Sequence, residues 1–272
     1  MPKHHSWFSF IPGFENFETS IAAITNNQGW LFKEAIHVQH IAAMIFVILL
    51  MLILAVFARN GLSKAEKGDI LPDSKLTARN LVELLMEAVL MVMQFTMSRE
   101  AALRHFWIVA PLAFFILFSN LLGLIPGFLP PTESINTTAA CALIVFVYYN
   151  VDALRRMGLG HLSHMANPGG DLVGWLLAPI FFPIEVISHA IRPVSLSIRL
   201  LCNIAGDHLV LAVFIGIAPF LLPLPFMALG LFVAIVQTFI FTVLTCVYIG
   251  EVETNVEHAQ HHHDHDSHAA AH

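Results

Sequence analysis

The chain has 272 residues, of which 57% are hydrophobic and 12% are charged, and its formal net charge is -6. Because soluble globular domains carry about 25% charged residues, this composition excludes a soluble enzyme and predicts a protein that crosses a membrane several times. No Lys or Arg follows Arg199, which argues against a basic surface for nucleic acid.

The first part of the chain predicts a leader, one crossing and one amphipathic helix. Residues 1–37 mix polar and aromatic side chains, and we expect them to lie outside a membrane domain that covers 38–254. Residues 41–58 form an apolar run without a charge, long enough for a first crossing. Residues 80–98 carry two glutamates one turn apart on an apolar background, which favours a helix lying in the plane of the membrane or one packed beneath the bundle.

The remainder predicts four more crossings and a tail. Residues 106–132 and 134–151 are apolar runs separated by a turn rich in proline. Residues 172–217 are too long for a perpendicular crossing, so we expect a long tilted helix that its prolines bend. A second long helix is expected at 226–250, followed at 255–272 by an acidic, His-rich tail that we expect to be disordered. The predicted fold class is therefore an all-α membrane protein with about five crossings.

The basic residues predict the orientation, because loops rich in Lys and Arg stay in the cytoplasm. Residues 59–104 carry seven of the 13 and 153–170 carry two, whereas 1–37 carry two. We therefore expect the N-terminus outside and, after five crossings, the C-terminus in the cytoplasm.

The stretch from Glu185 to His208 is the most informative part of the sequence. A helix through it places six polar side chains on one face at steps of three and four residues: Glu185, Ser188, Arg192, Ser195, Arg199 and Asn203. A charge at bilayer depth costs about 2.5–3.5 kcal/mol on insertion scales and normally faces protein or water. Since arginine stays protonated, a fixed cation here predicts a site where an anion comes and goes.

At PVSLSIRLLCNIAGDHLVL the chain resembles subunit a of the F-type ATP synthase membrane sector, with Arg199 followed four residues later by Asn203. The last helix, VQTFIFTVLTCVYIGE, resembles that family's terminal pattern and places its glutamine at Gln237. Further agreement lies in SNLLGLIP with Asn120, in PTESINTT and in PIEVIS with Glu185. The resemblance covers roughly 80–254.

The resemblance implies a proton-translocating subunit with two half-channels that meet a carboxylate on a rotating proteolipid ring, with Arg199 as the essential residue between them. It implies subunit c of that ring, subunit b of the peripheral stalk, other ATP synthase subunits and lipid as partners, and the bacterial plasma (inner) membrane as the location. The sequence holds no nucleotide-binding loop and no metal or redox spacing among its three cysteines. We therefore expect no cofactor, no metal and no enzyme activity of the subunit by itself.

The resemblance also implies two proton paths. The outer path would use Asn203, Asp207, His208, Gln237 and Asn120, and the inner path would use Glu185, Ser188 and His189. The family often pairs a polar residue nine positions after the arginine, here His208, with one on the last helix. That second place falls at Gly230, and Asp207 is the candidate to supply a carboxylate instead.

Structural roles compete with several of these assignments. Arg192 is more simply explained as a charge paired with Glu185 two turns away, and Ser195 as a secondary polar group. His189 suits a packing role, and Asn120 suits a helix–helix contact.

Two other functions stay open on the sequence alone. A secondary ion-coupled transporter should show an internal repeat of its crossings, and we find none in the sequence. The same subunit could be coupled to Na⁺ instead of H⁺, because the coupling carboxylate would lie on the ring.

Overall fold

The computed structural model describes residues 20, 39–65, 78–125, 128–158, 172–217 and 223–269, and it describes only the backbone at 39, 60–65, 78, 172–178, 181 and 257–269. The expected leader, 1–37, lies outside the described residues except for residue 20. The described part is helical: α2 (Gln39–Ala65), α3 (Ala78–Gln94), α4 (Arg99–Gly123), the short 3-10 turn η2 (Pro131–Glu133), α5 (Ile135–Met157), α7 (Leu172–Ile217) and α8 (Pro223–Ala269).

Five of the described helices contain segments long and apolar enough to cross a membrane. These segments are His40–Arg59, Arg99–Gly123, Ile135–Met157, Phe182–Ile217 and Pro223–Val256. The predicted all-α membrane fold is therefore confirmed. Helix α3 has 17 residues, is not among the five, and contacts α2, α4 and α8; its in-plane orientation stays a prediction.

The second crossing begins and ends earlier than the sequence predicted. We expected 106–132, but α4 covers Arg99–Gly123. Ser98 caps its start, because the Ser98 side chain accepts a hydrogen bond from the Ala101 amide at 3.4 Å. The helix ends shortly before Pro126 in the sequence, and the residue before a proline is disfavoured in the helical conformation.

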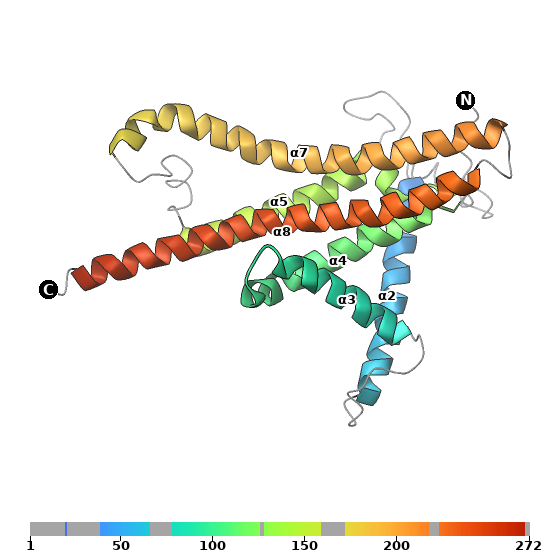
Figure 1. Ribbon diagram of the computed structural model, residues 1–272, viewed down its shortest axis with the longest axis horizontal. Coiled ribbons are helices and arrows are strands. Elements are labelled where there is room, and N and C mark those ends of the chain that lie inside the picture. The colour runs from blue at the N-terminus through green and yellow to red at the C-terminus, as the bar shows by residue number, and fades with distance from the viewer. Residues whose placement is uncertain are drawn as a thin grey trace.

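The long helix expected at 172–217 is present as α7, with the predicted bounds. It contains Pro179, Pro183 and Pro193, each of which removes one backbone hydrogen bond. Figure 1 shows α7 bending in its first turns, the part of the helix in which two of these prolines lie. The prediction that prolines would bend this helix without ending it agrees with the structure.

Helix α8 is longer at both ends than the predicted 226–250. It starts at Pro223 and continues to Ala269, so it enters the tail that we expected to be disordered from residue 255. The physical reason lies in the sequence, because no Gly or Pro follows Gly250 and nothing else there stops a helix. The last crossing itself extends to Val256.

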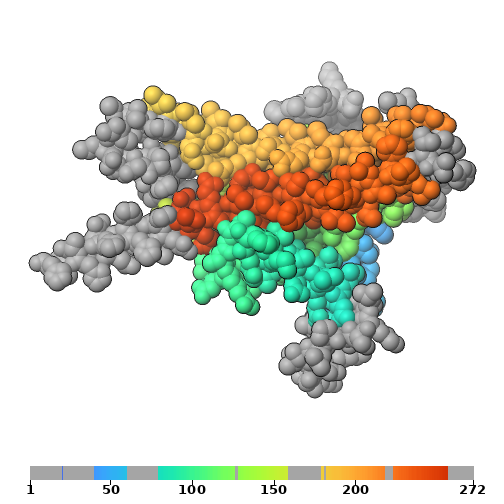
Figure 2. Space-filling model, viewed as in Figure 1, coloured from blue at the N-terminus to red at the C-terminus, as the bar shows by residue number. Residues whose placement is uncertain are grey.

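The crossing helices differ in how far they are buried. Half of the most apolar window in α4 is buried, whereas in α7 only 11% of it is. Figure 1 shows α7 and α8 running beside each other over much of their length, and Figure 2 shows them across the upper part of the visible face, with α3 below α8. Helix α7 therefore lies at the margin of the bundle with a long face uncovered by the described residues.

A buried ion-pair network joins one end of α4, α5 and α8. The Glu253 carboxylate of α8 accepts hydrogen bonds from Arg156 of α5 at 2.8 Å and Arg104 of α4 at 3.2 Å, and it contacts His105 Nε2 at 2.7 Å. The other ring nitrogen of His105 contacts the Tyr148 hydroxyl at 2.7 Å, and His105 is fully buried. This network fixes the end of α8 next to the inner cluster described below.

Candidate functional site

Arg199 lies in the uncovered face of α7. Its side chain is exposed, and no hydrogen bond or ion pair is found for it within the described ranges. The buried residues beside it, Leu196 and Leu200, are 2% and 0% exposed. The guanidinium therefore projects from an apolar wall, where an intramembrane charge requires a partner.

Polar side chains from three helices meet on one side of Arg199, and we call Asn120, Asn203, Asp207, His208 and Gln237 the outer cluster. Asn203 of α7 donates a hydrogen bond through its side-chain amide to the Gln237 carbonyl oxygen of α8. Gln237 is 2% exposed, and its side-chain nitrogen has no hydrogen-bond partner among the described residues. A buried amide nitrogen without a partner is a position where water is expected.

A cavity of about 40 Å³ lies at this cluster. Its lining includes all five residues of the outer cluster together with Gly123, Leu124 and Gly230. Since one water needs about 10–15 Å³ of such volume, the cavity has room for about three waters. The structure thus brings together the residues predicted for the outer path around a space that water can fill.

Asn120 is the member of the outer cluster that lies on α4, and it is 6% exposed. Its side-chain oxygen accepts a hydrogen bond from Thr132 of η2 at 3.3 Å, and its nitrogen donates to the Ala234 carbonyl at 3.5 Å. It therefore joins α4 to η2 and α8, which agrees with the packing role, and it also lines the cavity.

The ring of His208 contacts two groups that the sequence did not identify. Its Nε2 lies 3.0 Å from the Gly123 carbonyl oxygen, and its Nδ1 lies 3.3 Å from Glu133 Oε2. The expected carboxylate partner, Asp207, lines the cavity but makes no hydrogen bond or ion pair that the described part of the chain records. The carboxylate that lies against His208 is therefore Glu133, because η2 packs against α7 and α4, and the role expected for Asp207 stays a prediction.

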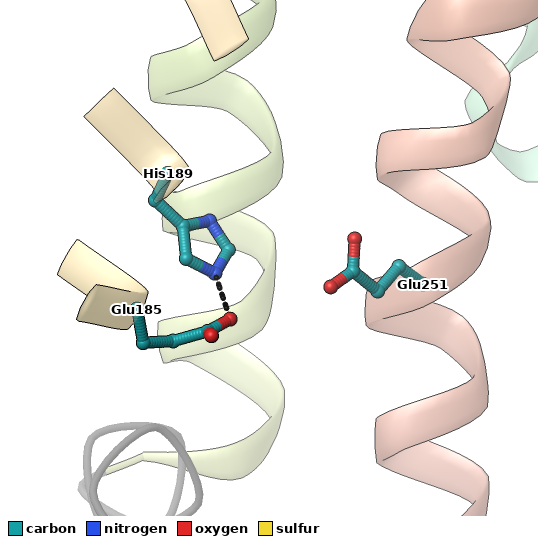
Figure 3. A group of neighbouring side chains, drawn as sticks. All are labelled: Glu185, His189 and Glu251. Atoms are coloured by element: carbon teal, nitrogen blue, oxygen red, sulfur yellow. Dashed lines mark ion pairs between the residues drawn. The ribbon is translucent and has the colours of Figure 1, made fainter. Parts of the chain in front are cut away.

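Polar side chains on the other side of Arg199 form the inner cluster, which we define as Tyr149, Glu185, His189, Arg192 and Glu251. Figure 3 shows Glu185 and His189 of α7 pointing toward Glu251 of α8. His189 Nε2 lies 3.3 Å from Glu185 Oε1, and the other ring nitrogen lies 3.4 Å from the Tyr149 hydroxyl. Two residues predicted for the inner path are thus in contact, and His189, 8% exposed, is also packed.

Arg192 has a different partner from the one predicted. Both of its terminal nitrogens donate to the Glu251 carboxylate, at 2.6 and 3.0 Å, and the guanidinium lies 5.1 Å from the centre of the Tyr248 ring. The expected pair with Glu185 is wrong, because Glu185 contacts His189 instead. A two-point contact of this kind holds arginine firmly, so the structural role expected for Arg192 fits its geometry.

A cation is a possible ligand of the inner cluster on composition alone. Ligand atoms of Glu185, His189 and Glu251 lie within 4.8 Å of one another. Both oxygens of Glu251, however, accept hydrogen bonds from Arg192, whose charge opposes that of a metal ion. We therefore assign no metal to this cluster.

The two serines predicted on this face lie away from both clusters. Ser188 is exposed, and Ser195 is exposed with its hydroxyl donating to the Arg192 carbonyl at 3.0 Å. Ser188 and Ser195 share the uncovered face of α7 with Arg199, as the predicted periodicity requires.

An apolar layer separates the outer and inner clusters inside the bundle. Leu196, Leu200 and Phe241 are at most 2% exposed and belong to one hydrophobic core. The one polar contact recorded at this level of α7 is between Ser197 and Thr138, at 3.1 Å. Between Gln237 and Glu251, three buried threonines of α8 donate to carbonyls of their own helix: Thr238, Thr242 and Thr245. No hydrogen bond recorded among the described residues therefore links the two clusters.

Comparison with known proteins gives a consistent match. The family model described as ATP synthase A chain matches residues 41–250. The chain is 40% identical to ATP synthase subunit a of Sorangium cellulosum over 217 residues, 79% of this chain and 83% of that protein. It is 42% identical to ATP synthase subunit a 3 of Pelobacter propionicus over 203 residues, 75% and 82% of the two chains. ATP synthase subunit a of Geobacter sulfurreducens is 40% identical to the chain over 203 residues, which cover 75% of this chain and 82% of that protein.

Proposed function

The chain belongs to the ATP synthase A chain family, and from that premise we propose that it is the subunit that carries protons to and from a rotating ring in the membrane sector. Membership gives it a role in the ATP synthase membrane sector as a non-catalytic subunit that assembles with other subunits. We propose subunit c of the ring and subunit b of the peripheral stalk as its direct partners.

One observation carries the proposal. Arg199 is exposed on α7 and has no ion-pair partner in the described residues, while a polar cluster lies on either side of it and an apolar layer closes the bundle between them. Seven residues separate Arg199 from Arg192 and nine separate it from His208, which corresponds to about 10 and 14 Å along a helix. This spacing suits two half-channels that open at different depths.

In the proposed mechanism, the outer cluster, the inner cluster and Arg199 each have a separate role. A proton enters through the outer cluster, where Asn203 and Gln237 with water in the cavity deliver it to a carboxylate of the ring. The carboxylate travels round with the ring and releases its proton to the inner cluster, where Glu185 and His189 accept it. Arg199 favours the ionised carboxylate between these events by its charge, and its fixed cation repels protons that would cross directly.

We propose the orientation predicted from the basic residues, with the outer cluster toward the outside and the inner cluster toward the cytoplasm. Arg104 and Arg156 lie at the same end as the inner cluster, joined to Glu253. That arrangement supports a cytoplasmic position for this end. Ser188 and Ser195 are proposed to face the ring.

Crosslinking tests the ring contact. In a chain without its natural cysteines, Ser195→Cys should form a disulfide with a cysteine placed beside the ring carboxylate, because Ser195 is exposed one turn from Arg199. Leu143→Cys, at a residue that is also exposed but lies on α5, is the control and should not react. The yield of crosslinked product on a denaturing gel measures both, and a Leu143 product without a Ser195 product would contradict the proposed interface.

Arg192→Ala should lower ATP synthesis several-fold without abolishing it, because the residue holds α7 to α8 through Glu251 and does not exchange protons. Glu251→Gln should cause a similar loss, and the double variant should be no worse than either single variant, since both remove one interaction. Synthesis rates in reconstituted vesicles measure this. Losses that multiply in the double variant would show that the two residues act separately.

A further inference from the structure

We propose that Glu133 and His208 form one proton-holding pair at the outer end of the cavity, and that Glu133 is the carboxylate through which outer protons enter. The inference rests on the proposed function, because it names the entry point of that proton path. It assigns a role to a residue that the sequence did not single out and that lies outside α7 and α8.

The structure fixes Glu133 in place. It ends η2, in which Pro131 restricts the backbone at the first position. Pro131 and Thr132 are buried, Thr132 donates a hydrogen bond to Asn120, and the Glu133 amide donates to the Pro130 carbonyl at 3.1 Å. The carboxylate is therefore held against α7 by the packing of its own turn.

The contacts of His208 determine which of its nitrogens carries a hydrogen. The Gly123 carbonyl can only accept, so Nε2 at 3.0 Å from it has to donate. A neutral ring then has a bare lone pair at Nδ1, directed at the oxygen of Glu133 3.3 Å away. Two acceptors at that distance repel each other unless a proton lies on one of them.

The Glu133 carboxylate also requires a proton at this contact. Glu133 Oε2 is buried and has no hydrogen-bond partner in the described residues, although His208 Nδ1 is within ion-pair distance. A buried acceptor without a donor is costly. A proton shared between Glu133 and His208 satisfies both atoms, whether as carboxylate with imidazolium or as carboxylic acid with neutral imidazole.

The pair lies between outer water and the cavity. The side chains of Glu133 and His208 are 26% and 24% exposed, and His208 lines the cavity whereas Glu133 does not. A proton taken up by Glu133 is shared with Nδ1, and cavity water then takes this proton from Nδ1 while Nε2 keeps its own hydrogen on the Gly123 carbonyl. Uptake of the next proton by Glu133 restores the pair. Among the described residues, the other titratable group lining this cavity is Asp207.

The surrounding shape keeps His208 in this position. A Cβ at Gly123 would lie 2.9 Å from the Pro130 ring and 3.1 Å from His208 Nε2. A side chain at Gly123 would therefore push the imidazole away from both partners. At Gly230 a Cβ would lie 3.0 Å from a Leu124 methyl group, so the opposite wall of the cavity is also closely packed.

The test compares three variants in purified, reconstituted ATP synthase. Glu133→Gln keeps the size and can donate to Nδ1, but it cannot release a proton, so synthesis should fall at least about tenfold, the lower range for loss of a proton-transfer group. Glu133→Asp keeps a titratable carboxyl and should retain much of the rate. Glu87→Gln removes an exposed carboxyl of α3 that lies in neither cluster, and it should leave the rate near that of the wild type.

Two further measurements separate proton transfer from packing. The dependence of synthesis on outer pH should lose one titration step in Glu133→Gln, which a structural role would not cause. In Glu133→Ala, acetate added on the outer side should restore synthesis, because Glu133 can be reached from solvent. Failure of acetate to raise the rate in an assembled complex would overturn the proposal.

The Arg199→Ala variant, measured in the same vesicles, separates a failure of the Glu133–His208 pair from a failure of the proposed function. Normal synthesis in Glu133→Gln with none in Arg199→Ala would overturn the pair while leaving the proposed function intact. Coupled synthesis in Arg199→Ala would overturn the proposed function itself. A loss in Asp207→Asn as large as in Glu133→Gln, with no recovery in Glu133→Asp, would assign proton entry to Asp207 instead.

Discussion

Replacing Arg199 by alanine should abolish ATP synthesis while the complex still assembles. We expect assembly to survive because the side chain is exposed and makes no ion pair within the described residues, so its loss breaks no contact inside the subunit. We expect synthesis to fail because an uncharged α7 would no longer favour the ionised carboxylate of the proposed ring, and a protonated carboxylate could pass without exchanging its proton at the other cluster. Synthesis and passive proton flux in reconstituted vesicles measure both effects.

Arg199→Lys should fail as well, although it preserves a positive charge at neutral pH. Lysine lacks the planar fork of the guanidinium, and its charge is lost more readily when water is excluded. Arg192→Ala is the matched control, because it removes an arginine seven residues away on the same helix. Near-normal coupled synthesis in Arg199→Ala would rule out the central role of this residue.

The substitution Glu253→Leu should cause the largest loss of stability. It leaves Arg104, His105 and Arg156 without their shared acceptor at a buried junction of three helices. Breaking a buried pair costs about 3–5 kcal/mol, and we expect about 3 kcal/mol here because Arg156 keeps a second partner, Asp152. Thermal unfolding of the purified complex, together with the amount of subunit found in it, measures the loss.

A matched substitution provides the control for Glu253→Leu. Glu87 of α3 is exposed, so Glu87→Leu should change stability by no more than about 0.5 kcal/mol. Equal unfolding temperatures for the two variants would show that the Glu253 network contributes little to the fold.

The crossings could be predicted from the sequence because hydropathy along the chain reports them directly. Residues 41–58 and 172–217 match α2 and α7 closely for that reason. The end of α4 was placed too late, since an apolar loop and an apolar helix look alike in composition. Likewise, the helix that continues past residue 255 has a polar sequence that gives no apolar signal.

The face of α7 was predictable, but the partners of its residues were not. Helical spacing alone puts Arg192 and Arg199 on one side. Arg192 pairs with Glu251, 59 residues away, and His208 with Glu133, on a separate turn. Such contacts depend on how helices pack, and a single sequence carries no record of it. In the sequence, Glu251 and Glu253 are simply two acidic residues after an apolar run. In the structure, both hold α8 to neighbouring helices through ion pairs.

The two-point contact between Arg192 and Glu251 has a mechanical consequence. A turning ring pulls sideways on whatever holds its carboxylate, so the proposed partner Arg199 transmits torque to α7. Pro193 and the prolines before it leave α7 with missing backbone hydrogen bonds, and an unsupported helix would yield there. Arg192 ties α7 to α8 beside Pro193, and two residues beyond Glu251 the Glu253 network ties α8 to α4 and α5. In the proposed complex, these contacts would hold α7 in place against the turning ring.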